Sequence, residues 1–95
     1  MNATANFQII EKEQIKFLHF PKEDVLNKKN DQLNRSLDLK RALSLGNLEH
    51  EKVKIYFADD AGFKKVETTI WAITDEAVIL KQATIIPLER IVSVA

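Results

Sequence analysis

The stretch TTIWAITDEAVIL, residues 68–80, decides how this chain folds, because it contains two short strands that are apolar on both faces. In the first strand Ile70 and Trp71 point to opposite faces, and in the second Val78 and Ile79 do the same. A strand with one wet face alternates between apolar and polar residues instead. The sequence therefore predicts that both faces of this region are covered.

The size and composition of the chain predict a single domain over residues 1–95. Hydrophobic residues make up 45% of the 95 residues and charged residues 29%, as in ordinary globular proteins. A chain this short buries only roughly 60–65% of the surface that its unfolded form exposes. The core is therefore small, and large exposed apolar side chains need an explanation.

The charge balance and the absence of cysteine exclude several classes of function. Fourteen basic side chains balance fourteen acidic ones, whereas nucleic-acid-binding domains usually carry a basic excess. No cysteine is present, so there is no disulfide framework, thiolate metal site or cysteine nucleophile.

The amino-terminal sequence MNATANFQIIEKEQ lacks the basic start and long apolar run of a secretory signal. No segment approaches the roughly 20 apolar residues that span a bilayer. We therefore expect a cytoplasmic protein with no membrane partner.

One helix is predicted, over residues 31–45. Asn30 or Asp31 is suited to cap its start, and Gly46 to end it in a left-handed conformation. Arg35 falls on its polar side. Its apolar arc consists of Leu33, Leu37, Leu39 and Leu43.

Residues 52–95 are predicted to form five short strands with tight connections. The strands are KVKIYF (52–57), KKVETTIWAI (64–73), AVILK (77–81), TIIPL (84–88) and IVSVA (91–95). Gly62, in the hairpin turn ADDAG, supplies a positive φ if one is needed. The expected fold is α+β, with the helix packed on a strongly bent five-stranded antiparallel barrel. The structure of residues 1–20 stays open, with strand character favoured early in this segment.

The outer face of these strands, with Trp71, Ile73 and Ile79, needs a cover. The leucine face of the 31–45 helix is one candidate, and a second copy of the chain is the other. Burying a side chain of this size is worth roughly 1.5–3 kcal/mol.

A helix followed by five short bent strands resembles the Sm-like barrel, the fold of Sm proteins and of the bacterial RNA chaperone related to them. The similarity is clearest in KVETTIWAITDEAVILKQATIIPLERIVSV, where TDEAVILK resembles the entry to the third Sm strand and RIVSV the closing strand. SH3-like and PRC-type barrels remain alternatives, and the chain also resembles small bacterial proteins of helix-plus-barrel build. The resemblance implies a small barrel, and RNA as a ligand.

The residues that carry RNA binding in that family do not match. The second strand, KVETTI, lacks the glycine that permits its bend, and Ala77 stands where the chaperone has an aromatic residue. Its YKH motif falls at Pro87, Leu88 and Glu89, and Arg90 lacks the glycine of the Sm arginine–glycine pair. The fold resemblance therefore does not bring the RNA site with it.

No residue pattern predicts catalysis, a metal or a cofactor. His19 and His50 are the only histidines, and their surroundings lack the spacing of a metal site. Asp59 and Asp60 resemble a carboxylate pair, but two turn-forming aspartates of a hairpin are the simpler interpretation. We therefore expect a protein that is not an enzyme.

Two features are candidates for binding. Lys54 and Tyr56 point out of the first strand and Lys64 and Lys65 lie in the next, so an aromatic ring among lysines is available to stack on a base. The simpler interpretation is a solvated strand face. Trp71 is either packed beneath the helix or the anchor of a protein partner.

The leading hypothesis is a non-catalytic cytoplasmic interaction module that binds a protein partner or itself through the barrel edge and helix. The alternative is RNA binding in the Sm-like manner through Lys54, Tyr56, Lys64 and Lys65.

Overall fold

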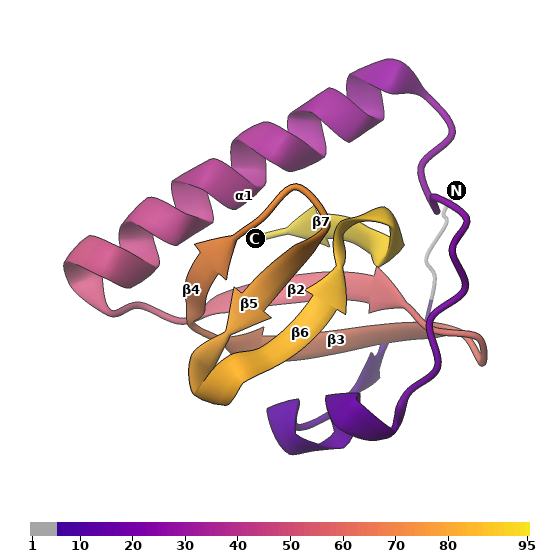
Figure 1. Cartoon of the computed structure of the whole chain (residues 1–95), viewed down its shortest axis with the longest axis horizontal. Helices are drawn as coiled ribbons and strands as arrows, with labels where there is room; N and C mark the ends of the chain where they lie inside the picture. Colours follow the sequence, from indigo (N-terminus) through magenta and orange to yellow (C-terminus); the bar gives the residue numbers. More distant parts are fainter. Residues whose placement is uncertain (1–5) are drawn as a thin grey trace.

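The computed structural model describes residues 6–95, and the fold is α+β, with one long helix and two sheets (Figure 1). Residues 1–5 of the predicted N-terminal segment lie outside the described residues. The elements in chain order are β1 (Gln8–Ile9), η1 (Lys12–Phe17), α1 (Lys29–Glu49), β2 (Val53–Ala58), β3 (Phe63–Thr68), β4 (Ile70–Ile73), β5 (Ala77–Leu80), η2 (Lys81–Ala83), β6 (Thr84–Pro87), η3 (Leu88–Arg90) and β7 (Ile91–Val94).

The strands form a first sheet in the order β1-β3-β2-β7 and a second sheet in the order β4-β5-β6. All five predicted strands are present, but the second one divides near Thr69 into β3 and β4, which belong to different sheets. Neighbouring strands pair antiparallel, except that β1 runs parallel to β3. The two sheets are not closed into a barrel by strand pairing.

The helix α1 is longer than predicted, and a different face of it is buried. Leu33 and Leu37 are 59% and 49% exposed, so the prediction that they cover the strands is wrong. The buried stripe is Arg35, Leu39, Ala42 and Gly46. Of the four leucines of the predicted arc, only Leu39 belongs to this stripe, and Leu43 is half-buried.

Gly46 does not end the helix, because it is the point where α1 packs closely on β4. A Cβ atom at this position would lie 2.6 Å from the carbonyl oxygen of Ile70, closer than real Cβ atoms approach. The helix ends instead at Glu49, and the next residue, His50, caps it in the left-handed conformation at φ 56°. The close approach explains why the small residues Ala42 and Gly46 form the end of the buried stripe next to β4.

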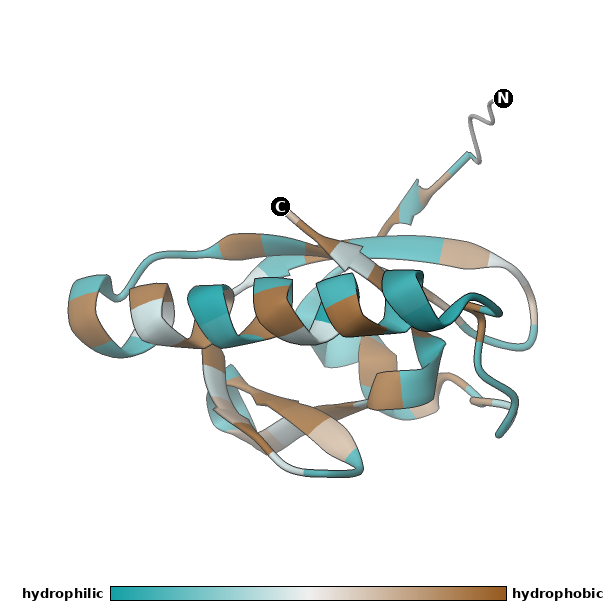
Figure 2. Cartoon of the chain, turned by 90° about the horizontal axis from the view of Figure 1, so that it is seen from above, coloured by the Kyte–Doolittle hydropathy of each residue, from teal (hydrophilic) through white to brown (hydrophobic). Residues whose placement is uncertain are grey.

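The core lies between the two sheets, and α1 runs along the molecule between them when it is seen from above (Figure 2). Phe57, Ile70, Val78 and Ile86 are fully buried there, and Ile15 of η1 adds a side chain from the N-terminal segment. The helix packs against β4 and β7, and η1 packs against β6. The early strand character predicted for residues 1–20 is confirmed by β1.

Two buried arginines attach the irregular segment 18–28 to the rest of the fold. Arg35 makes two bonds of 2.9 Å to the carboxylate of Asp24 and donates to the carbonyl of Ile91 at 3.0 Å. Arg90 donates to the carbonyls of Ala58 at 3.0 Å and Glu23 at 2.7 Å. A guanidinium has five N–H donors, so one buried arginine can satisfy carbonyls from several segments.

Candidate functional site

The outer face of the first sheet brings together three of the residues that the sequence singled out. Lys54 and Tyr56 point outward from β2, because the alternate residues of that strand are buried. Tyr56 lies directly opposite Lys65 of β3, and the Lys65 ammonium stands 5.6 Å from the centre of the Tyr56 ring. This distance is within the range of a cation–π interaction.

Two further aromatic rings complete this face. The Phe7 ring meets that of Tyr56 edge to face, with centres 4.9 Å apart, and that of Phe63 at 5.3 Å. Phe63 is 43% exposed, so one ring of the group is open to solvent. This grouping could not be predicted from the sequence, because Phe7 reaches the face through the parallel pairing of β1 with β3. We call Phe7, Tyr56, Phe63, Lys54 and Lys65 the aromatic face.

Lys64 does not belong to the aromatic face, because it points to the opposite side of β3. Its side chain is buried and its ammonium lies 3.2 Å from Asp59. The carboxylate of Asp59 also accepts the backbone N–H groups of Ala61 and Gly62 at 2.9 Å, which confirms its interpretation as a turn residue. The hairpin turn uses Gly62 at φ 147°, as expected.

These contacts set the protonation of Asp59. Burial alone would raise the pKa of this carboxyl, but the N–H groups of Ala61 and Gly62 and the Lys64 ammonium together lower it below its ordinary value. Asp59 is therefore a charged structural group of the turn.

The outer face of the second sheet is apolar. Ile79 of β5 lies opposite Ile85 of β6, and Ala77 lies opposite Pro87. Ala72 of β4 extends the row, since it pairs with Ile79. Ile85 is 53% exposed, and in Figure 1 this sheet lies on the near side of the molecule, with α1 along its upper edge rather than across it. We call Trp71, Ala72, Ala77, Ile79, Ile85 and Pro87 the apolar face.

Trp71 lies at an irregularity of β4, which explains why the helix does not cover it. Ile70 pairs with Leu80 but Ala72 pairs with Ile79, so Trp71 is an extra residue in the ladder. Such a bulge re-aims a side chain. Trp71 is 51% exposed, whereas Ile73 is turned inward opposite Val78 and packs against the core. The expectation that the helix covers Trp71 is therefore wrong.

Among residues 6–95, no group of three or more histidine and acidic side chains is arranged to hold a metal ion. In the same residues no helix is long and apolar enough to cross a membrane.

Comparison of the chain with protein-family models, with curated proteins and with solved structures finds no match. No family is therefore assigned, and a proposal about function rests on the geometry of these surfaces.

Proposed function

We propose that this protein is a non-catalytic interaction module that docks a protein chain on the apolar face, with Trp71 as the anchor. The observation that carries the proposal is the exposure of Trp71 and Ile85, each about half open to solvent, beside Ile79 on an uncovered sheet. A domain with a small core gains stability by burying such side chains, and exposed apolar patches of this kind mark interaction sites. Tryptophan is also among the residues that contribute most to binding energy at interfaces.

A second copy of the chain is the occupant that suits this face. The six residues carry no charge, so two copies can meet without bringing like charges together. A two-fold dimer uses the same patch on both subunits, and an uncharged apolar patch is self-complementary. The exposed leucines of α1, Leu33 and Leu37, lie outside the patch and form a separate surface.

The test is sedimentation equilibrium of the wild type between about 1 and 100 µM, the weak end of the affinities that interfaces of standard size show. We expect a dimer that Trp71→Ala weakens and Ile79→Lys abolishes, because a lysine at the centre of the patch would be buried without a partner. Leu37→Lys is the matched control, since it makes the same change on an exposed leucine of the helix. A wild type that stays monomeric, or a dimer that Leu37→Lys disrupts instead, would contradict docking through the apolar face.

The order and connections of the strands also bear on how the two sheets are arranged. β3 continues into β4 across the two sheets, and β7 follows β6 through the short turn η3 and pairs with β2. These connections support the proposal that the two sheets are the two halves of a partly open barrel of SH3 or Sm type. In this arrangement the apolar face lies on the outside of the barrel.

RNA binding is the second candidate, and the aromatic face is the observation that favours it. Phe63 offers an exposed ring on which a base can stack, while Lys54 and Lys65 can contact phosphates. Glu67 lies opposite Lys54 and reduces the local positive charge. Lys64 takes no part in this version of the hypothesis, because it is buried against Asp59.

Fluorescence anisotropy with short unstructured RNA at about 50 and 200 mM salt tests this candidate. RNA binding through the aromatic face predicts an affinity that falls with salt and that Lys54→Gln together with Lys65→Gln reduces, while Lys40→Gln on the helix leaves it unchanged. Absence of binding at the lower salt concentration would remove the RNA hypothesis without affecting the apolar face.

A further inference from the structure

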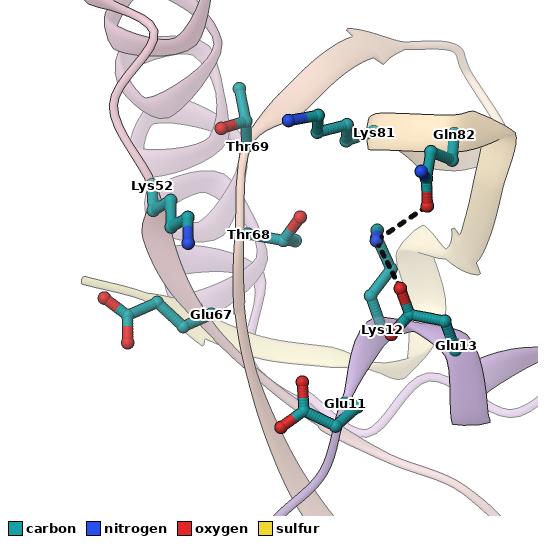
Figure 3. Close-up of a pocket in the computed structure, with 9 residues that line it drawn as sticks. All are labelled: Glu11, Lys12, Glu13, Lys52, Glu67, Thr68, Thr69, Lys81 and Gln82. Carbon is teal, nitrogen blue, oxygen red and sulfur yellow. Dashed lines mark hydrogen bonds and ion pairs between the residues drawn. The ribbon is translucent and has the colours of Figure 1, made fainter.

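A polar pocket of about 200 Å³ lies where β3 passes into β4, away from both sheet faces (Figure 3). It is lined by residues from four places in the chain, namely η1, the residue before β2, the end of β3 and the turn η2. Sites for drug-sized ligands occupy roughly 300–1,000 Å³, so this pocket suits a small ion or a single functional group.

Thr68 places a hydroxyl in this pocket for which the described residues, 6–95, supply no hydrogen-bond partner. The residue is 5% exposed, and within residues 6–95 its hydroxyl makes no hydrogen bond. A buried polar group without a partner costs stability, and a valine would fill the same space without that cost. Figure 3 shows the Thr68 side chain directed toward the space between Lys81, Gln82 and Lys12. The hydroxyl is therefore placed for a ligand.

The turn on the opposite side of the pocket is strained. Gln82 and Ala83 have φ angles of 65° and 60°, which residues other than glycine and asparagine rarely adopt. This backbone brings the Gln82 side chain over the pocket, where its Oε1 accepts a bond of 2.9 Å from the Lys12 ammonium. Because that oxygen is occupied, the amide contributes its N–H donors to the pocket. Strained backbone and an unsatisfied hydroxyl, both unfavourable for stability, thus occur at one place.

The pocket is lined by three lysines and three glutamates, and their positions leave hydrogen-bond donors at its centre. The carboxylate of Glu13 is bound by Lys12 at 2.9 Å, so these two charges neutralise each other. Figure 3 shows the carboxylate of Glu67 turned away from Thr68, and that of Glu11 at the lower rim, on the side opposite to Lys81 and Gln82. Lys81 extends over the pocket and forms no ion pair with any described residue. The central groups are therefore N–H and O–H donors.

We propose that this pocket binds a small oxyanion, a phosphate or carboxylate group, through the Thr68 hydroxyl, the Lys81 ammonium and the Gln82 amide. The proposal is independent of the apolar face, so the protein can carry a small-molecule site and a protein interface together. The pocket links η1 to the η2 turn through Lys12 and Gln82, and a bound oxyanion would strengthen that link.

The test is a titration of ¹⁵N-labelled protein with inorganic phosphate, and separately with acetate, at constant ionic strength. We expect saturable shifts at the backbone amides of Thr68, Thr69, Lys81 and Gln82. The anion that saturates at the lower concentration identifies the source of the oxyanion. Shifts that never saturate, or that follow exposed lysines across the surface, would overturn the proposal.

Variants distinguish the binding of an anion at a defined site from a general attraction of anions to positive charge. Thr68→Val should weaken the binding of the preferred anion about tenfold, as expected for a hydrogen bond to a charged group. Lys81→Met should weaken it similarly, whereas Lys40→Met, which removes the same charge from the exposed side of α1, should leave it unchanged. Equal losses from both lysine variants would mean attraction to net charge and would refute the site.

Thermal unfolding gives a second, independent readout. In the absence of added anion, Thr68→Val should melt at a higher temperature than the wild type, because it replaces an unsatisfied buried hydroxyl by a methyl group. A lower melting temperature would show that the hydroxyl has a structural role, and it would then no longer point to a ligand.

Discussion

The two sheets differ in how much of their surface the chain itself covers. Over the first sheet, Phe7 packs on Tyr56, and Arg35 occupies the carbonyl of Ile91 at the start of β7. On the second sheet, Trp71 and Ile85 remain about half exposed on the apolar face. β1 and Phe7 therefore add to the first sheet, whereas the apolar face of the second sheet stays open to solvent. The difference indicates that apolar strands alone do not mark a binding surface. Whether a strand face is open for binding depends on whether other parts of the chain cover it.

The largest expected effect comes from removing the cover of the first sheet at Arg35. Arg35→Met leaves Asp24 without its ion pair and the carbonyl of Ile91 without its donor. Breaking a fully buried pair costs roughly 3–5 kcal/mol, and we expect about 2–3 kcal/mol here because the Asp24 side chain is 26% exposed. Urea denaturation of the variant measures this loss.

The matched control is Arg41→Met, which removes an arginine from the same helix. Arg41 pairs with Asp38 at 3.5 Å, but its side chain is 74% exposed, so the expected loss is below about 0.5 kcal/mol. Similar losses for the two variants would mean that Arg35 does not hold the first sheet more firmly than a surface pair does.

Truncating one aromatic residue on each sheet compares the two surfaces directly. Tyr56→Ala should cost about 2 kcal/mol, from lost apolar contact and from its pairing with Phe7. Trp71→Ala removes a larger side chain but should cost less than about 1 kcal/mol in the monomer, since half of it is already in water. The measurement is urea denaturation at a protein concentration too low for association.

A larger loss of unfolding free energy for Trp71→Ala than for Tyr56→Ala would reverse the comparison. In that case Trp71 would be part of the core of the monomer, and the apolar face would lose its anchor.

The strands could be predicted from the sequence, whereas most contacts that decide the surfaces could not. Alternation within residues 52–95 predicts each strand locally. The break between β3 and β4 was missed because the chain bends near Thr69 without a glycine. The buried stripe of α1 was missed because it depends on the approach of Gly46 to Ile70, which local periodicity does not encode.

The candidate surfaces show the same limit. Lys54, Tyr56 and Lys65 share one face of the first sheet. Lys64 was grouped with them although alternation along β3 places it on the face opposite to Lys65, where it pairs with Asp59. The outward position of Trp71 depends on a bulge that only the pairing with β5 reveals. Phe7 joins the aromatic face across more than half of the chain, through a parallel pairing that no short motif predicts.

The smallest expected effect is a loss of stability in acid, and it should differ between the two sheets. The hydrogen bonds from Arg35 hold the pKa of Asp24 below its ordinary value, and the contacts of Asp59 lower its pKa as well. Both carboxylates are tied to the first sheet, Asp24 through Arg35, which also donates to Ile91 of β7, and Asp59 through its place in the β2–β3 turn. Acid should therefore weaken this side of the molecule first.

The sign follows from which state binds the proton. A carboxyl with a lowered pKa in the folded chain stays charged there after the unfolded chain, near its ordinary pKa of about 3.9, has begun to protonate. The stability it contributes is fully present above that pH and is lost as the pH falls toward the folded pKa.

Amide hydrogen exchange between neutral pH and about pH 3 measures this loss residue by residue. We expect Ala61 and Gly62, whose N–H groups bind the Asp59 carboxylate, to lose protection before the amides that pair β5 with β6. Asp59→Asn should remove this early step, because an amide does not titrate. If both sheets lost protection at the same pH in the wild type, the acid response would be global and the two sheets would unfold as one unit.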